Sequence, residues 1–383
     1  MGEPVIGSAE GSMDVQVLSV DVGVFTQDIL LWTGSYEMSF KLILPSPTQI
    51  IAGKVRRATA EGMDLSIVGE TMGGGPVNRA LRSHLEKGCS ITMTERSART
   101  IRDDLDRVRA MGVSIVSEDE ARALSERPRT VCLETKDLDT EAISRVVSGF
   151  GLALEPEVVA VGVEDHGTPT GSHGTPTEMA TAEGSRAEEE APLSDREVRF
   201  DHFKDILPAT SDGFGYSDPP SHYTRMSAVK RTMDADFPDA RHLVMDSKIA
   251  ALFGSASTVD RRCVLAADVG NGHITVGSLE GGELTGLFEH HTRLLTKDRV
   301  EGLIQRFTEG RLTHREVFED GGHGCHIVVP IGEAQVLVSG PRRTDLFTEA
   351  PPDVVFANPY GDVMITGNVG LTECARSRYG LQP

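Results

Sequence analysis

The sequence predicts an α/β protein of two related lobes, with a further α/β segment inserted into the first. Three observations predict this class. The chain has 383 residues, enough for two domains of ordinary size, each with its own core. An apolar strand that breaks into an acidic, glycine-containing turn occurs twice, within residues 17–32 and 264–279. Between them, residues 48–151 alternate between helical and strand patterns, as in a layered α/β unit.

The first acidic turn interrupts the stretch VLSVDVGVFTQDILLW, residues 17–32. It contains Asp21, Gly23 and the hydroxyl of Thr26, and a second apolar strand resumes at Ile29. A carboxylate at a strand end, followed at once by glycine, suits a loop whose backbone N–H groups approach an anion closely. Phosphate bound as a magnesium complex is the candidate anion. A third strand, over 38–44, completes an antiparallel meander.

The second acidic turn lies in the central stretch 243–279 and repeats this plan. A strand, a short helix ended by Gly254 and a second strand precede the turn, and a further strand follows it. Asp21 and Asp268 are the candidate active-site acids, because Mg²⁺ prefers hard oxygen ligands such as carboxylates. In the alternative, both aspartates only cap ordinary turns. The second turn comprises Asp268, Val269, Gly270, Asn271 and Gly272.

The inserted segment carries its own candidate site in GETMGGGP, residues 69–76. Three consecutive glycines before a helix that starts near Pro76 can bind an anion at the helix N-terminus. We assign this loop to a second substrate; in the alternative it is a flexible connector. The clearest helix of the segment is expected over 97–111. The residues assigned to the second substrate here are Glu70, Gly73, Gly74 and Gly75.

A buried-looking strand over 158–163 ends in Glu164, Asp165 and His166. Asp165 could accept a proton from a substrate hydroxyl or orient a water. Equally, it could cap the loop that follows, and the two interpretations stay open. We place His166 on the second-substrate side of the site.

Two segments are predicted to be disordered. Residues 1–13 are small, polar and glycine-rich, and residues 168–194 have almost no bulky apolar side chains. Histidines are a further feature: His290, His291 and His323 could form a zinc or iron site with His166. Because their spacing matches no recognised metal motif, we favour isolated hydrogen-bonding or surface histidines.

The formal net charge of -20 disfavours nucleic acid and anionic membranes as partners. The five cysteines are scattered along the chain and form neither a disulfide framework nor a CxxC pair. No apolar run is long enough to span a bilayer, and the N-terminus has no signal-peptide pattern. These features predict a cytoplasmic protein in a reducing compartment.

Taken in order, the two acidic turns, the helix DSKIAALFG at 246–254 and the strand end VLVSG at 336–340 resemble the actin-like ATPase superfamily. This superfamily contains actin, sugar kinases and heat-shock chaperones. The resemblance implies two ribonuclease H-like lobes, at 14–235 (with the inserted segment at 48–151) and 236–360. Residues 361–383 are then expected to pack back between the lobes.

The same resemblance implies Mg-ATP in the cleft between the lobes, with Asp21 and Asp268 holding Mg²⁺ through water. Because the superfamily core accounts for the ATP phosphates, the loop at 69–76 is left for the second substrate. Asp21, Gly23 and Thr26 would hold the phosphates from one side, and the turn at 268–272 from the other. Small residues in two further segments would let the backbone lie against adenine and ribose, although they could equally allow close helix packing. These residues are Gly340, Gly367 and Gly370.

More closely, GETMGGGP, EDHG, GNGHIT, FEHHT, DGGHG and YGDVMITGNVGL resemble a mainly archaeal family of unknown function. Its members carry a provisional label as pyruvate formate-lyase activating enzymes. Such enzymes hold an iron–sulfur cluster on a CxxxCxxC run, which is absent here, so we do not adopt the label. Two departures from the wider superfamily, Asp246 in place of Glu and His273 in place of Thr or Ser, predict weak nucleotide affinity or hydrolysis.

Together these features predict a Mg-dependent phosphotransferase or ATPase that acts on an unknown small-molecule or protein substrate, with Asp165 as its base. Two alternatives remain. The chain could be a nucleotide-regulated binding module without turnover, or a degenerate fold retained for assembly. The oligomeric state is left open.

Overall fold

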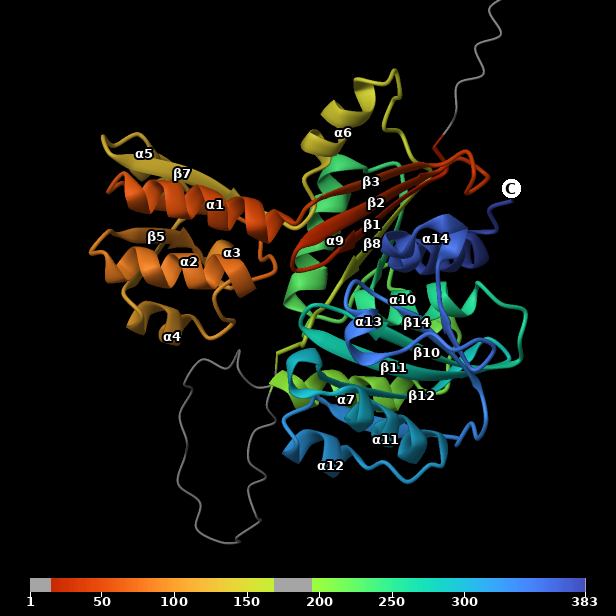
Figure 1. The fold of residues 1–383 in the computed structure, drawn as a ribbon. Coiled ribbons are helices and arrows are strands. Elements are labelled where there is room, and N and C mark those ends of the chain that lie inside the picture. The colour runs from red at the N-terminus through yellow and green to blue at the C-terminus, as the bar shows by residue number, and fades with distance from the viewer. Residues whose placement is uncertain (1–14, 169–194, 383) are drawn as a thin grey trace, which may run out of the picture.

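The computed structural model describes residues 15–168 and 195–382, and it contains three β-sheets. Figure 1 shows the two larger sheets one above the other, with the smallest sheet and its helices set to one side. The tail expected at 1–13, and all but the first residue of the loop expected at 168–194, lie outside the described residues.

The first sheet has the strand order β3-β2-β1-β8-β9. Its first three strands form the expected antiparallel meander, and β8 and β9 run parallel to β1. Both faces are covered, which explains why β8 consists of six buried residues with no polar alternation. The strands are β1 (Val17–Val22), β2 (Thr26–Trp32), β3 (Phe40–Pro45), β8 (Val158–Val163) and β9 (Arg241–Met245).

The second sheet repeats this order as β12-β11-β10-β14-β15 and adds β13 outside β12. Three antiparallel strands again lead into two parallel ones. This repeated order is that of two ribonuclease H-like lobes, so the predicted fold class is confirmed. The strands are β10 (Cys263–Val269), β11 (His273–Glu280), β12 (Glu283–His291), β13 (Gly324–Ile327), β14 (Gln335–Ser339) and β15 (Val354–Phe356).

The expected boundary between the lobes, at residue 235, is wrong. Strand β9 begins at Arg241, yet it pairs in parallel with β8 and is the outer strand of the first sheet. Its apolar residues Leu243 and Met245 are fully buried in the core between the two sheets. The chain therefore enters the second lobe only after Met245.

Two helices, α10 (Ser247–Ala256) and α14 (Thr366–Tyr379), lie between the lobes and pack against each other (Figure 1). We expected Gly254 to end the first helix, but α10 continues to Ala256. A methyl group at Gly254 would overlap with the backbone oxygen of Thr366, and one at Gly370 with that of Ala250. Both glycines therefore serve this close helix crossing.

The inserted segment is a small domain whose parallel sheet has the order β6-β5-β4-β7. The helix expected over 97–111 is instead two short helices, because the side chain of Asp104 accepts hydrogen bonds from the N–H groups of Asp106 and Arg107 and starts a new helix. The elements are β4 (Asp64–Gly69), β5 (Ile91–Thr94), β6 (Val113–Val116), β7 (Thr130–Thr135), α1 (Pro47–Ala60), α2 (Gly75–Glu86), α3 (Glu95–Ala98), α4 (Leu105–Ala110) and α5 (Glu118–Ser125).

The remaining helices cover the outer faces of the two large sheets or link them. No helix in the described ranges combines the length and apolar character that crossing a bilayer requires. They are α6 (Thr140–Ser148), α7 (Asp195–Ile206), α8 (Ser211–Phe214), α9 (Thr224–Asp236), α11 (Lys297–Thr308), α12 (His314–Glu319), α13 (Arg343–Leu346), and the 3₁₀ turns η1 (Thr292–Leu294), η2 (Pro359–Gly361) and η3 (Val363–Ile365).

Candidate active site between the lobes

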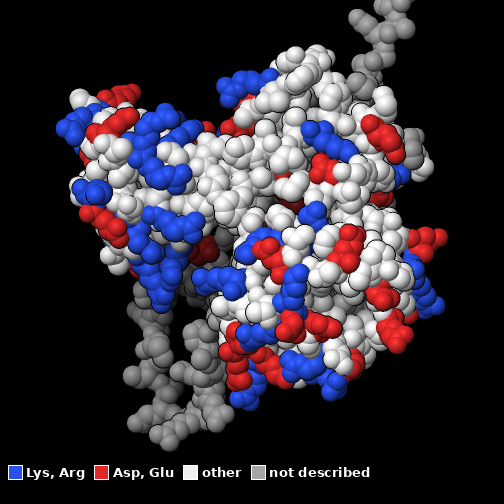
Figure 2. All heavy atoms as spheres, viewed as in Figure 1, with Lys and Arg blue, Asp and Glu red and all other residues white. Residues whose placement is uncertain are grey.

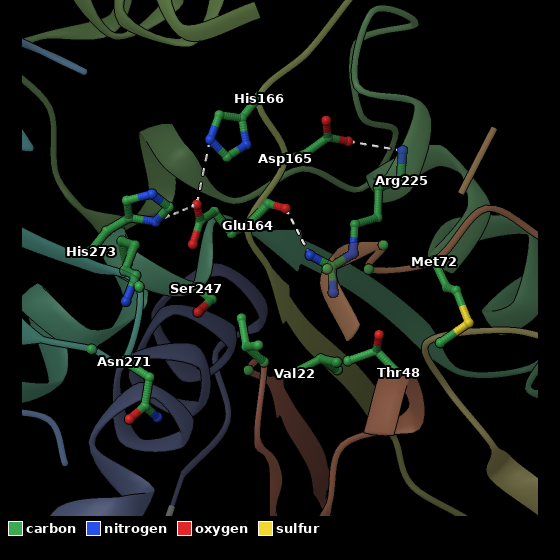
Figure 3. A pocket seen from close by; sticks show the side chains of 18 of the residues that line it. Val22, Thr48, Met72, Glu164, Asp165, His166, Arg225, Ser247, Asn271 and His273 are labelled. Atoms are coloured by element: carbon green, nitrogen blue, oxygen red, sulfur yellow. Dashed lines mark hydrogen bonds and ion pairs between the residues drawn. The ribbon is translucent and has the colours of Figure 1, made fainter. Parts of the chain in front are cut away.

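A cleft of about 840 Å³ is lined by both lobes and by the small domain. Figure 3 shows side chains from β1, from the end of β8 and from α10 converging on it. Nine of the residues that the sequence assigned to nucleotide line this one cleft, whereas Gly370 does not and packs against α10 instead. The nine residues are Asp21, Gly23, Thr26, Asp268, Gly270, Asn271, Gly272, Gly340 and Gly367.

Asp21 and Asp268 occupy equivalent places, as the penultimate residues of the equivalent strands β1 and β10. Burial raises the pKa of Asp21 to about 7; the nearby charge of Asp268 adds to this shift, and the Ser247 hydroxyl opposes it. Among the described residues, the Oδ1 atom of Asp21 is buried without a hydrogen-bond partner. A methyl group at Gly367 would overlap with the other carboxylate oxygen. Gly367 thus makes room for Asp21.

Sequence reasoning missed Asp28, which pairs with Asp21 across the β1–β2 hairpin. It lines the same cleft, and its Oδ1 atom also lacks a hydrogen-bond partner among the described residues. Burial and, second to it, the charge of Asp21 raise the pKa of Asp28 to about 8. Two carboxylates opposite each other on antiparallel strands repel when both are ionised, so the pair titrates as a unit.

The second lobe neutralises its acidic turn. Lys248, from the first turn of α10, donates a hydrogen bond of 2.8 Å from Nζ to Oδ2 of Asp268. Burial alone would lower the pKa of Lys248, but the charges of Asp268, Glu164 and Glu289 and the hydrogen bond to Asp268 together raise it. Gly270 leaves room for this ammonium group, since a methyl group there would lie 2.5 Å from Nζ. At Gly340, where φ is +90°, a side chain would overlap with Val269 and approach Asp268.

At the end of β8, Asp165 adopts the capping role and not that of a free base. Its carboxylate accepts hydrogen bonds from the backbone N–H groups of Gly167 (2.9 Å), Arg225 (2.8 Å) and Met226 (3.0 Å). It thereby caps the start of α9. The neighbouring Glu164 instead faces the cleft, where Oε1 lies 3.1 Å from Nδ1 of His273 and 3.5 Å from Nε2 of His166 (Figure 3).

The loop of the small domain divides between two roles. Gly73, Gly74 and Gly75 line the cleft, and the N–H of Gly73 donates to the carboxylate of Asp137 (3.1 Å). Glu70 does not line it: its carboxylate pairs with Arg96 and Arg231 and so ties the small domain to α9. The assignment of Glu70 to substrate is therefore wrong.

Basic side chains gather where the small domain faces the cleft. In Figure 2, Lys and Arg are concentrated along the edge of this domain beside the hollow, over α4. Three arginines from this region line the cleft, namely Arg99, Arg102 and Arg107. Asp103 and Asp104 line the same part, and Arg107 pairs with Asp104 (3.1 Å). The cleft thus has an acidic side at the two turns and a small excess of positive charge at the small domain.

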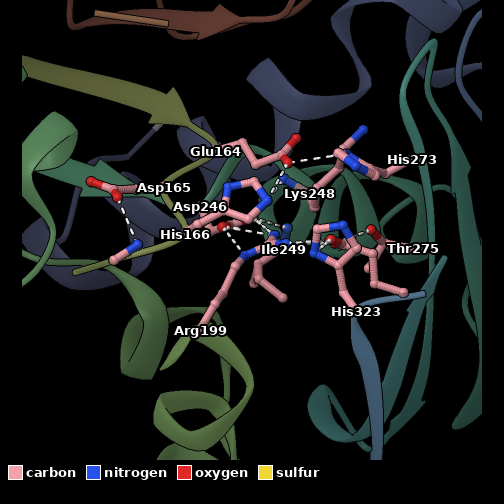
Figure 4. A network of polar contacts seen from close by, with 12 residues as sticks. Glu164, Asp165, His166, Arg199, Asp246, Lys248, Ile249, His273, Thr275 and His323 are labelled. Atoms are coloured by element: carbon pink, nitrogen blue, oxygen red, sulfur yellow. Dashed lines mark hydrogen bonds and ion pairs between the residues drawn. The ribbon is translucent and has the colours of Figure 1, made fainter. Parts of the chain in front are cut away.

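The histidines are not isolated, contrary to our expectation. His273, His291 and His323 form a cluster whose ring centroids lie 4.5 to 5.0 Å apart, and His166 approaches His323 from the first lobe, at 5.1 Å. Figure 4 shows His166, His273 and His323. Burial lowers the pKa of His291 to about 4 and that of His323 to about 3. His290 lies apart from the cluster and contacts Asp320 instead, at 3.1 Å.

A buried ion network supports the cluster from below (Figure 4). Arg199 is fully buried; it contacts both oxygens of Asp246 (2.9 and 3.0 Å) and both oxygens of Glu289 (2.6 Å each). Burial alone would raise the pKa of Glu289, but Arg199 and His323 hold this pKa at about 2. Asp246 also caps α10 through the N–H groups of Lys248 and Ile249. This second role accounts for an aspartate at position 246.

Comparison with known proteins gives one informative result. No curated protein matches the chain. Among solved structures, an ethanolamine utilization protein EutJ from Carboxydothermus hydrogenoformans shares 11% identity over 92% of this chain and 88% of its own, with a TM-score of 0.25. A nucleotide-free acetone carboxylase shares 11% identity over 71% of this chain and 45% of its own, with a TM-score of 0.22. Both scores are low, so the fold assignment depends on the strand order of the two sheets. The model of one family matches residues 72–178 and 188–345, and the chain therefore belongs to the family described as "Putative pyruvate format-lyase activating enzyme (DUF1786)".

Proposed function

We propose that this protein binds Mg-ATP in the cleft between its lobes and is a Mg-dependent phosphotransferase or ATPase. One observation carries the proposal. The acidic turns of the two lobes, at equivalent positions in two equivalent sheets, face a single cleft of about 840 Å³. A cleft of this size is within the range that holds small-molecule ligands and cofactors.

The residues of the first lobe fit a magnesium ion. The Oδ1 atoms of Asp21 and Asp28 are buried without partners among the described residues, and hard oxygens of this kind are the ligands or water-binding groups that Mg²⁺ prefers. When bound, the ion would neutralise charge on the phosphates. The N–H groups of Gly23 and Gly270 already donate to the backbone oxygens of Thr26 and His273 (2.9 Å each). The residues that follow these two glycines in the turns would therefore offer their backbone N–H groups to those phosphates, and Lys248 would add a positive charge.

We do not retain Asp165 as the proton acceptor for a second substrate. Three backbone N–H groups donate hydrogen bonds to the carboxylate of Asp165. We therefore assign Asp165 to positioning the strand end that carries Glu164 and His166. Those two side chains line the cleft between the acidic turns and the glycines of the small domain. The arginines on that side favour an anionic second substrate.

The radical chemistry implied by the family description does not fit these residues. A cluster needs three cysteines close together, yet no group of metal-ligating side chains among the described residues includes a cysteine. Burial also raises the pKa of Cys325 to about 12 and that of Cys374 to about 11, which disfavours the thiolate that binds iron. We derive no step through an iron–sulfur cluster.

The proposal is tested by thermal unfolding of the wild type with Mg-ATP, with Mg²⁺ alone and with ATP plus chelator. Selective binding to the folded state must raise its stability, by about 2.7 kcal/mol at a ligand concentration 100 times Kd. We expect a shift with Mg-ATP that Asp268→Asn weakens. The matched control Asp260→Asn changes an exposed aspartate outside the cleft and should keep the full shift. No shift in the wild type would overturn the proposal.

The ion pair between Lys248 and Asp268 favours one alternative, a binding module that closes on nucleotide without turnover. With its charge neutralised, Asp268 offers less to a metal or an attacking water. Phosphate release and transfer to a panel of acidic metabolites distinguish the two. Turnover that Asp268→Asn abolishes supports the enzyme; nucleotide binding without turnover supports the module.

A further inference from the structure

A cluster of three histidines stands beside the proposed nucleotide site, in positions that the sheet fixes. His273 starts β11 and His291 ends β12, and the two residues are paired in the antiparallel register. His323 directly precedes β13, and its N–H donates to the backbone oxygen of Glu289 (2.9 Å). Three neighbouring strand ends therefore present one imidazole each at the same edge of the sheet. Sites built on strands are held more precisely than sites on loops.

The separation of the rings suits one metal ion. Each histidine offers a ring nitrogen, and these three nitrogens lie within 4.8 Å of one another. If all three nitrogens lie the full 4.8 Å apart, the point equidistant from them is about 2.8 Å from each. Zinc–nitrogen bonds measure about 2.0 to 2.1 Å. Closing the difference needs an inward movement of about 0.7 Å per ring, which rotation of the side chains can supply.

His323 gives an independent sign of a missing partner. Its side chain is only 2% exposed, and within the described part of the chain neither ring nitrogen makes a hydrogen bond. Nδ1 lies 3.2 Å from Oε1 of Glu289 but lacks the alignment of a hydrogen bond. Buried polar side chains normally have a partner, and an unsatisfied one calls for an ion or water that is not represented.

The surroundings resemble a second coordination shell. Histidine ligands usually turn one ring nitrogen to a carboxylate and the other to the metal. Here Glu164 lies 3.1 Å from Nδ1 of His273, and Glu289 lies beside His323. Glu289 is itself held by Arg199 and by the hydroxyl of Thr275 (2.8 Å). Both carboxylates are thus fixed where they can orient the rings.

We propose that His273, His291 and His323 bind one first-row divalent transition-metal ion. Imidazole nitrogens suit zinc, iron, cobalt or nickel and not magnesium, so this site differs from the proposed Mg-ATP site. The three histidines line the cleft, which leaves the remaining coordination positions of the ion open to water or to an anionic oxygen of a cleft ligand. His166 is a fourth candidate ligand from the opposite lobe, because it groups with His323 and Glu289 within the same 4.8 Å limit.

The test uses full-length protein without a histidine tag, stripped with a chelator. Titration with Zn²⁺ is followed by calorimetry, and Co²⁺ is added separately to record its d–d absorption bands. We expect one Zn²⁺ per chain, binding unaffected by excess Mg²⁺, and Co²⁺ bands of a nitrogen-rich site. No nucleotide is present, so the result is independent of the proposed ATP function.

Two ligand variants and one control make the outcome specific. Loss of a residue that supports a metal ligand typically weakens metal binding roughly 10- to 100-fold, and Glu164→Gln should weaken Zn²⁺ binding within that range. His291→Ala and His323→Gln should each weaken Zn²⁺ binding by more. His326→Ala removes a half-buried histidine of the adjacent strand that is outside the cluster, and should bind as the wild type does. Circular dichroism checks that each variant is folded. If His323→Gln does not fold, the test depends on His291→Ala, because His291 is the more accessible of the two residues. Failure of the folded wild type to bind, or binding that His291→Ala leaves unchanged, would overturn the proposal.

Discussion

Replacing Asp21 by asparagine should make the protein more stable while removing its response to Mg-ATP. The substitution conserves the shape of the side chain but removes a charge that burial and the nearby Asp268 disfavour. A residue retained at a cost to stability is expected where a ligand later compensates for it. The two effects have opposite signs, so a general loss of structure cannot imitate them.

The magnitude follows from the pKa of Asp21, which is about 7 in the folded protein and 3.8 in a model peptide. Because the folded value is raised, the folded state holds this proton more tightly than the unfolded state. Ionisation therefore costs nothing below pH 3.8, an increasing amount up to pH 7 and a constant amount above it. At 1.36 kcal/mol per pKa unit, the cost reaches at most about 2 kcal/mol at about pH 5.5 and about 4 kcal/mol at about pH 8.

Urea unfolding of wild type and Asp21→Asn at these two pH values measures the effect. The variant should gain stability at both, and more at the higher pH by up to about 2 kcal/mol. In thermal unfolding, Mg-ATP should raise the Tm of the wild type more at pH 8 than at pH 5.5, because Mg²⁺ needs the ionised carboxylate.

Asp28→Asn is the matched control because it removes the other half of the same acidic pair. It should also stabilise the protein at high pH, since burial and Asp21 raise the pKa of Asp28 to about 8. Because Asp28 belongs to the same proposed magnesium site, its loss should also weaken the Mg-ATP response. With this negative neighbour gone, Asp21 ionises at lower pH, so the response that remains should move to lower pH. An Asp21→Asn protein that gains the same stability at both pH values, or that keeps the Mg-ATP shift, would refute the reasoning.

Three further substitutions test the framework around the cleft, each by urea unfolding. Gly254→Ala should destabilise the protein by about 3 kcal/mol, because the added methyl group meets the backbone of α14. As its control, Gly302→Ala should stabilise the protein by up to about 1 kcal/mol, because no described atom lies within 4 Å of the new methyl group. Asp165→Asn should cost about 1 to 2 kcal/mol through the lost cap of α9 yet leave the Mg-ATP shift in place. Arg199→Met leaves two buried carboxylates unpaired and should cost about 3 to 5 kcal/mol. Since Arg199 lowers the pKa of Glu289, this loss should be greatest above pH 4.5 and shrink as the pH falls towards 2.

Local sequence patterns predicted the acidic turns correctly as structure. An apolar run, an aspartate and a glycine act over a few neighbouring residues, so the hairpins at Asp21 and Asp268 form where they were expected. The same hairpin register also implied Asp28, because a short turn centred between two residues places them opposite each other. That signal is present in the sequence.

Other features depend on contacts between distant segments. Gly254 looks like a helix stop, but its function is set by α14, more than a hundred residues away. Strand β9 follows a helix that covers the first sheet, and only its pairing with β8 shows which lobe it joins. Likewise, His273, His291 and His323 have no motif spacing, because strand register and a loop bring them together.

The two lobes repeat one topology but divide the charge unequally. Where β1 and β2 place Asp28 opposite Asp21, β10 and β11 place Thr275 opposite Asp268. Lys248 neutralises Asp268, and Arg199 neutralises Glu289, whereas the pair in the first lobe has no cation bonded to it among the described residues. An incoming cation is therefore attracted to the first lobe, and phosphate oxygens meet less repulsion at the second. From this asymmetry we infer that Asp21 and Asp28 form the magnesium side of the cleft, while Lys248 and the turn at Gly270 form the phosphate side.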